Sequence, residues 1–343
     1  MSSVLNPNDA FASLPLEVLL DSYQLSQAIF TLVHLRIPEH LHENGPTSLA
    51  TLAAQTKADE KILRHLLEIA RCLELVGWDS MQGYALTPRG QRLCTTANDT
   101  VRPLMTLLER GYAAWGAMPQ AFKTGQTPFE TVYGTNFFRD LARNPEQNRA
   151  FNQLMAITTE LWLAATGVHY PFTGHLIDLG GNTGALSIRL LQQFPALRAT
   201  VFDLPQALEQ APAVIENAGV TARCALVPGS FFEPAAIPRD GDIYLVSRVL
   251  LNWNDDQAVE ILRNCRQAMS VTSRLLILEF VLPDPAPFGS LLTSLNLWVM
   301  FGASIRTQGE FEALLARAGF SDPRWIAIGA NPSRDLYLLE ARP

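Results

Sequence analysis

The sequence of 343 residues contains few cysteines and no pair of them with the spacing of a zinc or redox site. Cys72, Cys94, Cys224 and Cys265 are separated by 22, 130 and 41 positions, so no CxxC motif occurs. Isolated thiols of this kind are typical of a reduced, cytoplasmic protein. We therefore expect neither a disulfide framework nor a bound metal.

Basic residues are in the minority, because 26 Lys and Arg stand against 33 Asp and Glu. An acidic chain argues against a nucleic-acid partner, since phosphate binding requires a basic face. Residues 1–15 lack the basic and apolar segments of a signal peptide, which favours a cytoplasmic location. The longest uncharged stretch, residues 285–305, contains two prolines and two glycines, so we interpret it as a loop and a buried helix and not as a membrane span.

The first half of the chain, residues 14–166, shows helical periodicity almost throughout. Helical segments up to residue 75 precede a short apolar hairpin over residues 76–87, which is a winged-helix pattern. Residues 59–70 take the place of a recognition helix but carry mixed charge and a thick apolar stripe. This composition favours a dimerisation or lid module over DNA binding. Residues 101–166 are predicted to form connecting helices.

From residue 175 onward, short apolar runs alternate with helical segments. This alternation predicts an α/β domain with a parallel sheet that is covered on both faces. Only residues 329–335 join the last two runs, which is too short for a parallel crossover, so the last strand must be antiparallel. The runs cover residues 176–179, 199–203, 224–227, 243–246, 275–278, 325–328 and 336–339.

A glycine-rich turn, DLGGNTG, follows the first of these strands and precedes a helix. Such a turn lets a nucleotide-like ligand approach the backbone and the helix N-terminus. The dinucleotide pattern GxGxxG is absent, and Asp203 ends the next strand, 19 residues after Gly184. A carboxylate there can accept two hydrogen bonds from a ribose diol. The turn alone fits either NAD or S-adenosylmethionine.

The ordered series of motifs around this turn resembles the class I S-adenosylmethionine-dependent methyltransferases. Within that class it is similar to the two-domain small-molecule O-methyltransferases, which include plant caffeate-type and bacterial antibiotic-tailoring enzymes. The segments that carry the resemblance are FNQLM and TPRGQRL in the first half, then DLGGNTG, VFDLPQAL, PGSFFEP, LVSRVLLNWNDDQAVEILRNC, LLILEFVLPD and IRTQGEFEALLARAGF.

The resemblance implies a winged-helix dimerisation domain over residues 1–98 and connecting helices that line a substrate pocket over residues 99–166. It also implies a cofactor-binding domain over residues 167–343, with a Rossmann-like seven-stranded sheet whose last strand is reversed. A homodimer in the cytoplasm and a small aromatic substrate follow from the same resemblance, with no role for nucleic acid, membrane or metal.

Carried over position by position, the resemblance also implies the residues that contact S-adenosylmethionine. The methionine moiety is expected at Asp178, the ribose at Asp203, and the adenine at Leu204, Ser230 and Phe231, although Phe231 also fits plain core packing. The full set of expected cofactor-binding residues is Asp178, Gly180, Gly181, Gly184, Asp203, Leu204, Gly229, Ser230, Phe231, Phe232, Ser247 and Arg248. Asn182 replaces a family glycine, and Asn tolerates left-handed backbone better than most residues.

The chain departs from the family at the catalytic position. The family has a histidine as general base where this chain has Leu251, and a glutamate where it has Ile305, which leaves Glu279 as a flanking carboxylate. The LLNW variant resembles an anthracycline-tailoring branch that contains a 4-O-methyltransferase and a 10-hydroxylase. Asn252 is then expected to orient the substrate, with capping of the next helix as the alternative, and Arg306 is expected to stabilise an oxyanion.

An apolar pocket wall is expected to receive a flat aromatic substrate. Its predicted members, each of which also fits plain core, are Trp115, Phe151, Met155, Trp298, Met300 and Phe301.

The main hypothesis is methylation of an acidic hydroxyl on an aromatic or heteroaromatic natural product, with S-adenosylhomocysteine as the second product. Because a positioned oxygen and a sulfonium methyl react without a base when the hydroxyl is acidic, proximity replaces the histidine. The first alternative is a non-methylating tailoring enzyme that uses the bound sulfonium as a charge for hydroxylation, decarboxylation or cyclisation. C- or N-methylation is a variant of the main hypothesis. The second alternative is a cofactor-sensing winged-helix regulator.

Overall fold

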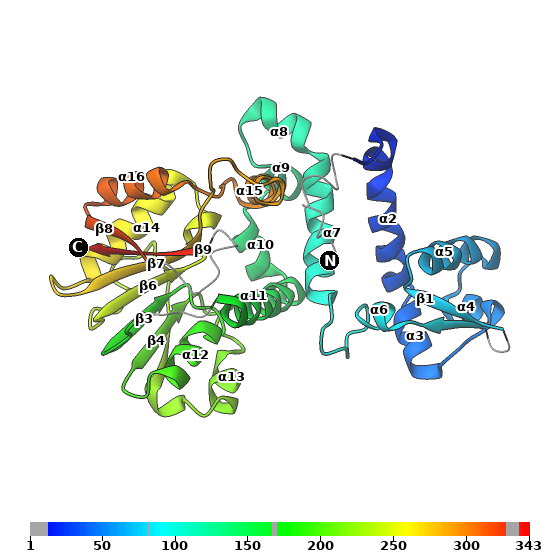
Figure 1. Cartoon of the computed structure of the whole chain (residues 1–343), viewed down its shortest axis with the longest axis horizontal. Helices are drawn as coiled ribbons and strands as arrows, with labels where there is room; N and C mark the ends of the chain where they lie inside the picture. Colours follow the sequence, from blue (N-terminus) through cyan, green and yellow to red (C-terminus); the bar gives the residue numbers. More distant parts are fainter. Residues whose placement is uncertain (1–12, 81–82, 167–169, 327–335) are drawn as a thin grey trace, which may run out of the picture. The chain divides into compact units, whose positions relative to one another are not determined.

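The computed structural model describes residues 13–80, 83–166, 170–326 and 336–343. The chain divides into two compact units, Met1–Arg110 and Gly111–Pro343 (Figure 1). Helix α7 (Arg102–Gly116) contains the boundary between them.

Unit 1 is helical apart from one hairpin. Its elements are α2 (Leu16–His34), α3 (Ile37–Asn44), α4 (Leu49–Thr56), α5 (Glu60–Cys72), β1 (Val76–Asp79), β2 (Gly83–Leu86) and α6 (Pro88–Gln91). Helices α4 and α5 begin after Ser48 and Asp59, because each of these side chains accepts a backbone N–H of the first helical turn. β1 and β2 pair antiparallel, and Thr47 bridges to Tyr84 beside them. The predicted winged-helix pattern is confirmed.

Helix α5 packs along one face, as its apolar stripe predicts. Leu63, Leu67 and Ala70 are buried in the core of unit 1, whereas Ile62 and Ile69 on other faces are exposed. The phenol of Tyr84 donates to Glu68 and thereby ties the hairpin to this helix. The helix in the position of a recognition helix is therefore part of the core of its own unit.

Unit 2 begins with the connecting helices and continues with the sheet and its covering helices. The connecting helices are α8 (Met118–Thr124), α9 (Pro128–Tyr133), α10 (Phe137–Arg143) and α11 (Pro145–Thr166). The strands are β3 (His175–Leu179), β4 (Arg198–Asp203), β5 (Cys224–Pro228), β6 (Ile243–Ser247), β7 (Arg274–Phe280), β8 (Ser321–Ile326) and β9 (Leu336–Arg342). The other helices are α12 (Ala185–Gln193), α13 (Ala211–Asn217), α14 (Asp255–Ala268), α15 (Phe288–Phe301) and α16 (Gln308–Ala318), with single 3-10 turns η1 (Thr221–Arg223) and η2 (Leu250–Asn252).

The seven strands form one sheet in the order β5-β4-β3-β6-β7-β9-β8. Strands β3 to β7 are parallel to one another, and β9 lies antiparallel between β7 and β8. The predicted reversal of the last strand is confirmed. The predicted strand over residues 325–328 begins earlier, at Ser321, and its last two residues lie outside the described part of the chain. The early start was hidden by Pro323, which the sheet accepts because β8 is an edge strand with an irregular register between Ser321 and Arg324.

Helices cover both faces of the sheet. Side chains of α12 and α13 pack on one face with Leu176 of β3, and those of α14 and α16 pack on the other face with Ile177. Figure 1 shows the two helix pairs on opposite sides of the strands. The helix layers on both faces of the sheet confirm the predicted Rossmann-like α/β fold.

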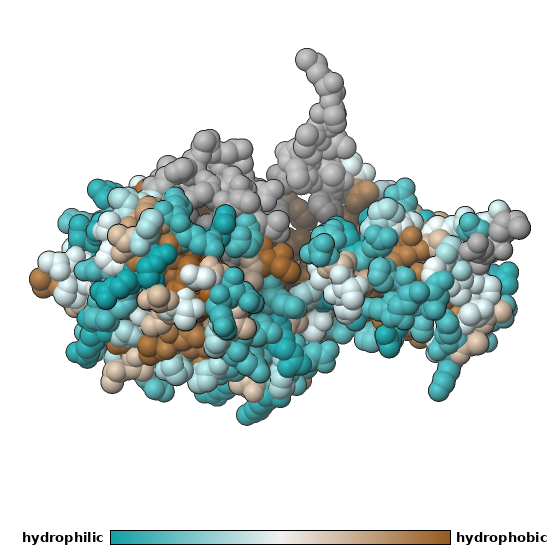
Figure 2. Space-filling model, turned by 90° about the horizontal axis from the view of Figure 1, so that it is seen from below, coloured by the Kyte–Doolittle hydropathy of each residue, from teal (hydrophilic) through white to brown (hydrophobic). Residues whose placement is uncertain are grey.

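On the face drawn in Figure 2, hydrophilic residues predominate over hydrophobic ones.

The uncharged stretch over residues 285–305 forms a loop followed by helix α15, as predicted, but only the second half of the helix is buried: Leu297, Val299 and Met300 are buried, whereas Leu291 and Leu292 are exposed. None of the described helices combines the length and apolar character needed to cross a bilayer.

Strand β3 sits where the order of the sheet reverses, because β4 lies on one side of it and β6 on the other. In open α/β sheets, the carboxyl ends of the strands at such a point form a crevice that binds ligands. The topology therefore places the site at the loops that follow β3, β4 and β6.

Candidate active site

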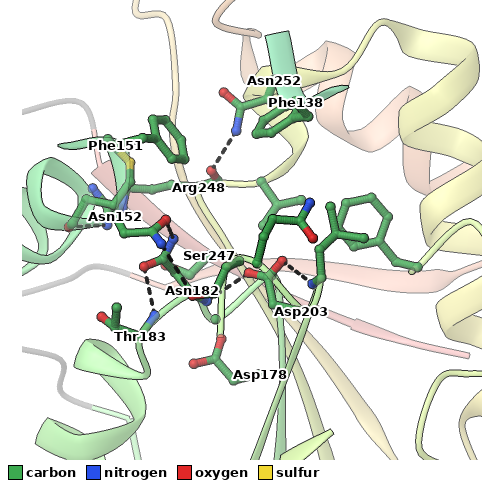
Figure 3. Close-up of a pocket in the computed structure, with 18 of the residues that line it drawn as sticks. Phe138, Phe151, Asn152, Asp178, Asn182, Thr183, Asp203, Ser247, Arg248 and Asn252 are labelled. Carbon is green, nitrogen blue, oxygen red and sulfur yellow. Dashed lines mark hydrogen bonds between the residues drawn. The ribbon is translucent and has the colours of Figure 1, made fainter. Parts of the chain in front are cut away.

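A cavity opens at the carboxyl ends of β3 to β6 and is closed on another side by α10, α11 and η2. It encloses about 1150 Å³ of space, including the part open to solvent. Most of the expected site residues line it: Asp178, Gly180, Gly181, Asp203, Leu204, Gly229, Ser230, Phe231, Phe232, Ser247, Arg248, Asn252, Phe151 and Met155. Figure 3 shows how several of these side chains face one another.

The turn after β3 exposes its backbone to the cavity. Gly180 has φ +77°, and a Cβ atom there would lie 2.6 Å from a methyl carbon of Val249. A Cβ atom on Gly181 would lie 2.7 Å from the carboxylate of Asp178. Only glycine fits both positions. Gly184 does not line the cavity; it has φ +80° and is the N-cap of α12.

Two carboxylates, those of Asp178 and Asp203, line the cavity together with this turn. The Oδ2 atom of Asp203 accepts the N–H of Asn182 at 2.8 Å, and its Oδ1 atom accepts the N–H of Leu204 at 2.7 Å. Asp178 is buried and accepts the hydroxyl of Ser187. Burial raises the pKa of each carboxyl to about 6. Each oxygen of Asp203 retains a second lone pair that can accept a ligand hydroxyl.

Arg248 lies between the sheet and α11. Its backbone is left-handed, with φ +53°, and its guanidinium donates to the hydroxyls of Thr158 and Thr159 and to the carbonyl of Met155. Burial lowers the pKa of this guanidinium. The side chain therefore fixes α11 against the loop that follows β6.

Asn252 lines the cavity from η2, and its amide donates to the carbonyl of Arg248 at 3.3 Å. The alternative interpretation, that Asn252 caps the next helix, is wrong. Asn254 caps α14 instead, in a reciprocal pair with Gln257. The amide of Asn252 is thus placed toward the cavity and not toward the helix end, as Figure 3 shows.

Leu251, at the position of the family's histidine, does not line the cavity. Its backbone N–H donates to Glu279 at 3.3 Å. Glu279 is 2% exposed, also accepts the N–H of Phe280, and lies outside the lining. Burial raises the pKa of Glu279 to about 8. The flanking carboxylate thus holds the backbone of η2 in place.

Arg306 does not face the cavity, contrary to expectation. Its side chain is 4% exposed and donates to the carbonyls of Leu250 and Trp253 at 2.8 and 2.6 Å and to Asp255 at 2.9 Å. These three bonds use the guanidinium to hold the η2 loop from behind. The sequence could not predict these contacts, because the acceptors are backbone carbonyls, which every residue has.

The aromatic wall of the cavity differs in part from the prediction. Phe151 and Met155 line it, as do Phe138 and Trp253, whose rings stack at 5.2 Å and 19°. Phe301 does not line the cavity, but its ring stacks on the ring of Phe138 with 5.7 Å between the ring centroids. It therefore supports the wall from behind.

Trp115, Trp298 and Met300 also lie outside the lining. The indole of Trp115 donates to Asn296, and the ring of Trp298 packs on Phe122. These residues form the packing between α15 and the first helices of unit 2. Periodicity marks them as apolar, but it does not distinguish a second packing layer from a wall.

Three polar residues of α11 were missed. Asn148, Asn152 and Thr159 are buried and line the cavity. A signal was present, since Asn148 and Asn152 are four residues apart on one helix face, beside the predicted Phe151 and Met155.

No histidine lines the cavity in the described part of the chain, and His169 lies outside that part. Among the described residues, no group of His, Cys, Asp and Glu is arranged to hold a metal ion. The site offers glycine backbone, carboxylates, amides and aromatic rings.

Comparison with known proteins identifies this arrangement. The O-methyltransferase domain family matches residues 115–321, and the O-methyltransferase dimerisation domain matches residues 18–96. The chain belongs to the S-adenosylmethionine-dependent O-methyltransferase family. The predicted family and fold class are confirmed.

Relatives of this family member include two bacterial O-methyltransferases and a solved O-methyltransferase structure. A phenazine O-methyltransferase of Lysobacter antibioticus is 33% identical, with 99% of this chain and 100% of the relative covered. A mitomycin biosynthesis 6-O-methyltransferase of Streptomyces lavendulae is 32% identical, with 98% of each covered. The crystal structure of an O-methyltransferase from neocarzinostatin biosynthesis, in complex with S-adenosylmethionine and 2-hydroxy-5-methyl naphthoic acid, is 28% identical, has a TM-score of 0.79, and covers 92% of this chain and 95% of its own.

We predict that Arg306→Ala destabilises unit 2. The change leaves the carbonyl of Trp253 without its guanidinium donor and the carbonyl of Leu250 with the N–H of Trp253 as its remaining donor, which costs about 1–3 kcal/mol of the free energy of unfolding. Urea denaturation measures the difference.

The matched control is Arg317→Ala. Arg317 pairs with Asp256 in the first turn of α14, next to Asp255, the partner of Arg306. Both side chains of this pair are exposed, so the free energy of unfolding should fall by at most about 1 kcal/mol. Equal destabilisation by the two variants would contradict the positioning role of Arg306.

Proposed function

We propose that this methyltransferase acts on an acidic hydroxyl of an aromatic or heteroaromatic natural product. One observation carries the proposal: the glycine turn, the Asp203 carboxylate and an aromatic wall line the same cavity. This combination suits a nucleoside-containing cofactor beside a flat organic molecule.

The residues present fit S-adenosylmethionine. Gly180 and Gly181 leave room for close approach where a Cβ atom would clash, and Asp203 has lone pairs for the ribose hydroxyls. Leu204 and Phe231 offer apolar surface for the adenine, and Ser247 and Arg248 stand at the opposite, β6 side of the cavity. When bound, this cofactor supplies an electrophilic methyl group on a sulfonium.

The acceptor is proposed to lie against Phe138, Phe151, Met155 and Trp253. Rings and a thioether form a flat apolar slot there, and the amide of Asn252 reaches it with the polarity to orient a hydroxyl or carbonyl. The products are a methyl ether, S-adenosylhomocysteine and one proton.

Proton removal is proposed to need no protein base. Leu251 has no titratable group, and Glu279 is held by two backbone N–H groups outside the lining. Holding the reactants in line supplies up to about 7–11 kcal/mol of the barrier, whereas a general base adds only about 10²–10⁴-fold in rate. A hydroxyl acidified by conjugation with a carbonyl loses its proton to water near neutral pH.

We further propose a homodimer. The dimerisation-domain match supports it, and so does the apolar surface that α2 exposes at Leu16, Leu20 and Tyr23. The cytoplasmic location stays a prediction.

The experiment is incubation with S-adenosylmethionine labelled on the methyl group and a panel of hydroxy-naphthoic, hydroxyphenazine and phenolic acceptors. We expect label on an acceptor oxygen, with one S-adenosylhomocysteine per methyl ether, detected by mass spectrometry. Label on carbon or nitrogen would overturn the O-specific proposal. A changed acceptor mass with intact cofactor would favour the non-methylating alternative, and binding of cofactor with no reaction across the panel would count against the acceptor class.

Cofactor affinity is predicted to depend on pH through Asp203. Because burial raises its pKa to about 6, the carboxylate is ionised at pH 8 and gains a proton as the pH falls through 6. The neutral form is a weaker acceptor for ribose hydroxyls, so we expect the dissociation constant of S-adenosylhomocysteine to rise below pH 6, by at most about tenfold per pH unit for this group.

Isothermal titration calorimetry between pH 5 and 8 measures this dependence. Asp203→Asn should bind more weakly at pH 8 and show a flatter profile, with the remaining slope due to Asp178, which titrates in the same range. A wild-type dissociation constant that stays the same from pH 8 to 5 would contradict the assignment.

A further inference from the structure

Asn182 lies in the glycine turn, and both polar atoms of its side chain are hydrogen-bonded. The backbone has φ +53°, and its N–H donates to the Asp203 carboxylate. The side-chain oxygen accepts the N–H of Thr183 at 2.7 Å, and the side-chain nitrogen donates to Asn152 of α11 at 2.7 Å. Figure 3 shows Asn182 between Asn152 and Asp203. A glycine here would make the first contact but neither of the others.

Asn152 is a buried partner for this amide. It is 1% exposed, and its own nitrogen donates to the carbonyl of Ala207, in the loop that follows β4. Asn148, one turn earlier, donates to Gln206 of the same loop at 2.8 Å. The first half of α11 is thus joined by amides to the loops after β3 and β4.

The residues beside Asn152 form the apolar wall. Phe151 precedes it in the sequence, and Met155 lies one turn later on the face that lines the cavity. The following turns of α11 are held by the guanidinium of Arg248, which donates to Thr158, to Thr159 and to the carbonyl of Met155. Among the hydrogen bonds of the described residues, the Asn182–Asn152 bond joins the turn after β3 directly to the first half of α11, which carries Phe151 and Met155.

We propose that Asn182 is a positioning residue that couples occupancy of the cofactor site to the placement of the acceptor wall. The inference rests on the proposed function, because it assigns the turn to the cofactor and Phe151 and Met155 to the acceptor. A ligand that fixes the turn through Asp203 also fixes Asn182, and Asn182 fixes Asn152 and the first half of α11. Because such coupling is reciprocal, the acceptor strengthens cofactor binding by the same factor.

Asn182→Gly tests this with little disturbance of the backbone, since glycine adopts φ +53° without strain and keeps the N–H that Asp203 accepts. Hydrogen exchange is measured with and without saturating S-adenosylhomocysteine. In the wild type we expect the ligand to slow exchange in the turn over residues 180–184 and in residues 145–155. In Asn182→Gly the turn should remain protected on ligand binding, whereas residues 145–155 should lose most of the ligand-dependent protection.

A second readout is kinetic. Loss of one neutral hydrogen bond is worth up to about tenfold in an equilibrium, so we expect KM for the acceptor to rise about 3- to 10-fold in Asn182→Gly. The dissociation constant of S-adenosylhomocysteine measured alone should change less than that. Asn152→Ala should reproduce the KM effect, and the double variant should be no worse than either single variant, because both remove the same link.

Gln153→Ala is the matched control, because Gln153 lies on the exposed side of α11 next to Asn152 and does not line the cavity. It should match the wild type in both measurements. Ligand-dependent protection of residues 145–155 that is the same in Asn182→Gly and in the wild type would overturn the inference while leaving the proposed function intact. Failure of the wild type to bind S-adenosylhomocysteine would instead overturn the proposed function.

Discussion

The hydrogen bond from the backbone of Asn182 to the carboxylate of Asp203 is the constraint on which the site depends. It joins the turns after two neighbouring parallel strands at the point where the order of the sheet reverses. The turn has a left-handed backbone at Gly180 and Asn182, and this hydrogen bond stabilises it. Its backbone then faces a cavity that the aromatic residues of α10 and α11 close from the other side.

In the proposed mechanism Leu251 provides no base, and the rate comes from the geometry of the site. Here the η2 loop that carries Leu251 and Asn252 is held from both sides: Glu279 accepts an N–H, and Arg306 donates to two carbonyls. Neither Glu279 nor Arg306 lines the cavity. Both side chains instead fix the loop that carries Asn252, which is consistent with the proposed catalysis by orientation.

Much of this arrangement was predictable from the sequence, because it depends on local patterns. The strand–turn–helix around Gly180 and the carboxylate at the end of β4 follow from periodicity and motif spacing. The roles of Arg306 and Trp298 were not predictable, since they depend on which partner lies across the fold: three acceptors behind a loop in one case, and Phe122 in the other. The spacing of Asn148 and Asn152 places both on the predicted pocket face of α11, but the partner of Asn152, Asn182, could not be predicted because it lies in a distant turn that only the fold brings beside it.

The central claim, transfer without a protein base, is tested most directly by the pH profile of kcat/KM for a series of ring-substituted acceptors of one scaffold whose hydroxyl pKa values differ. Without a protein base, the pKa seen in the profile should follow the hydroxyl pKa of each acceptor, because ionisation of the acceptor itself limits the reaction. A pKa that stays constant across the series, for example near the value of about 8 for Glu279, would reveal a protein base and contradict the account.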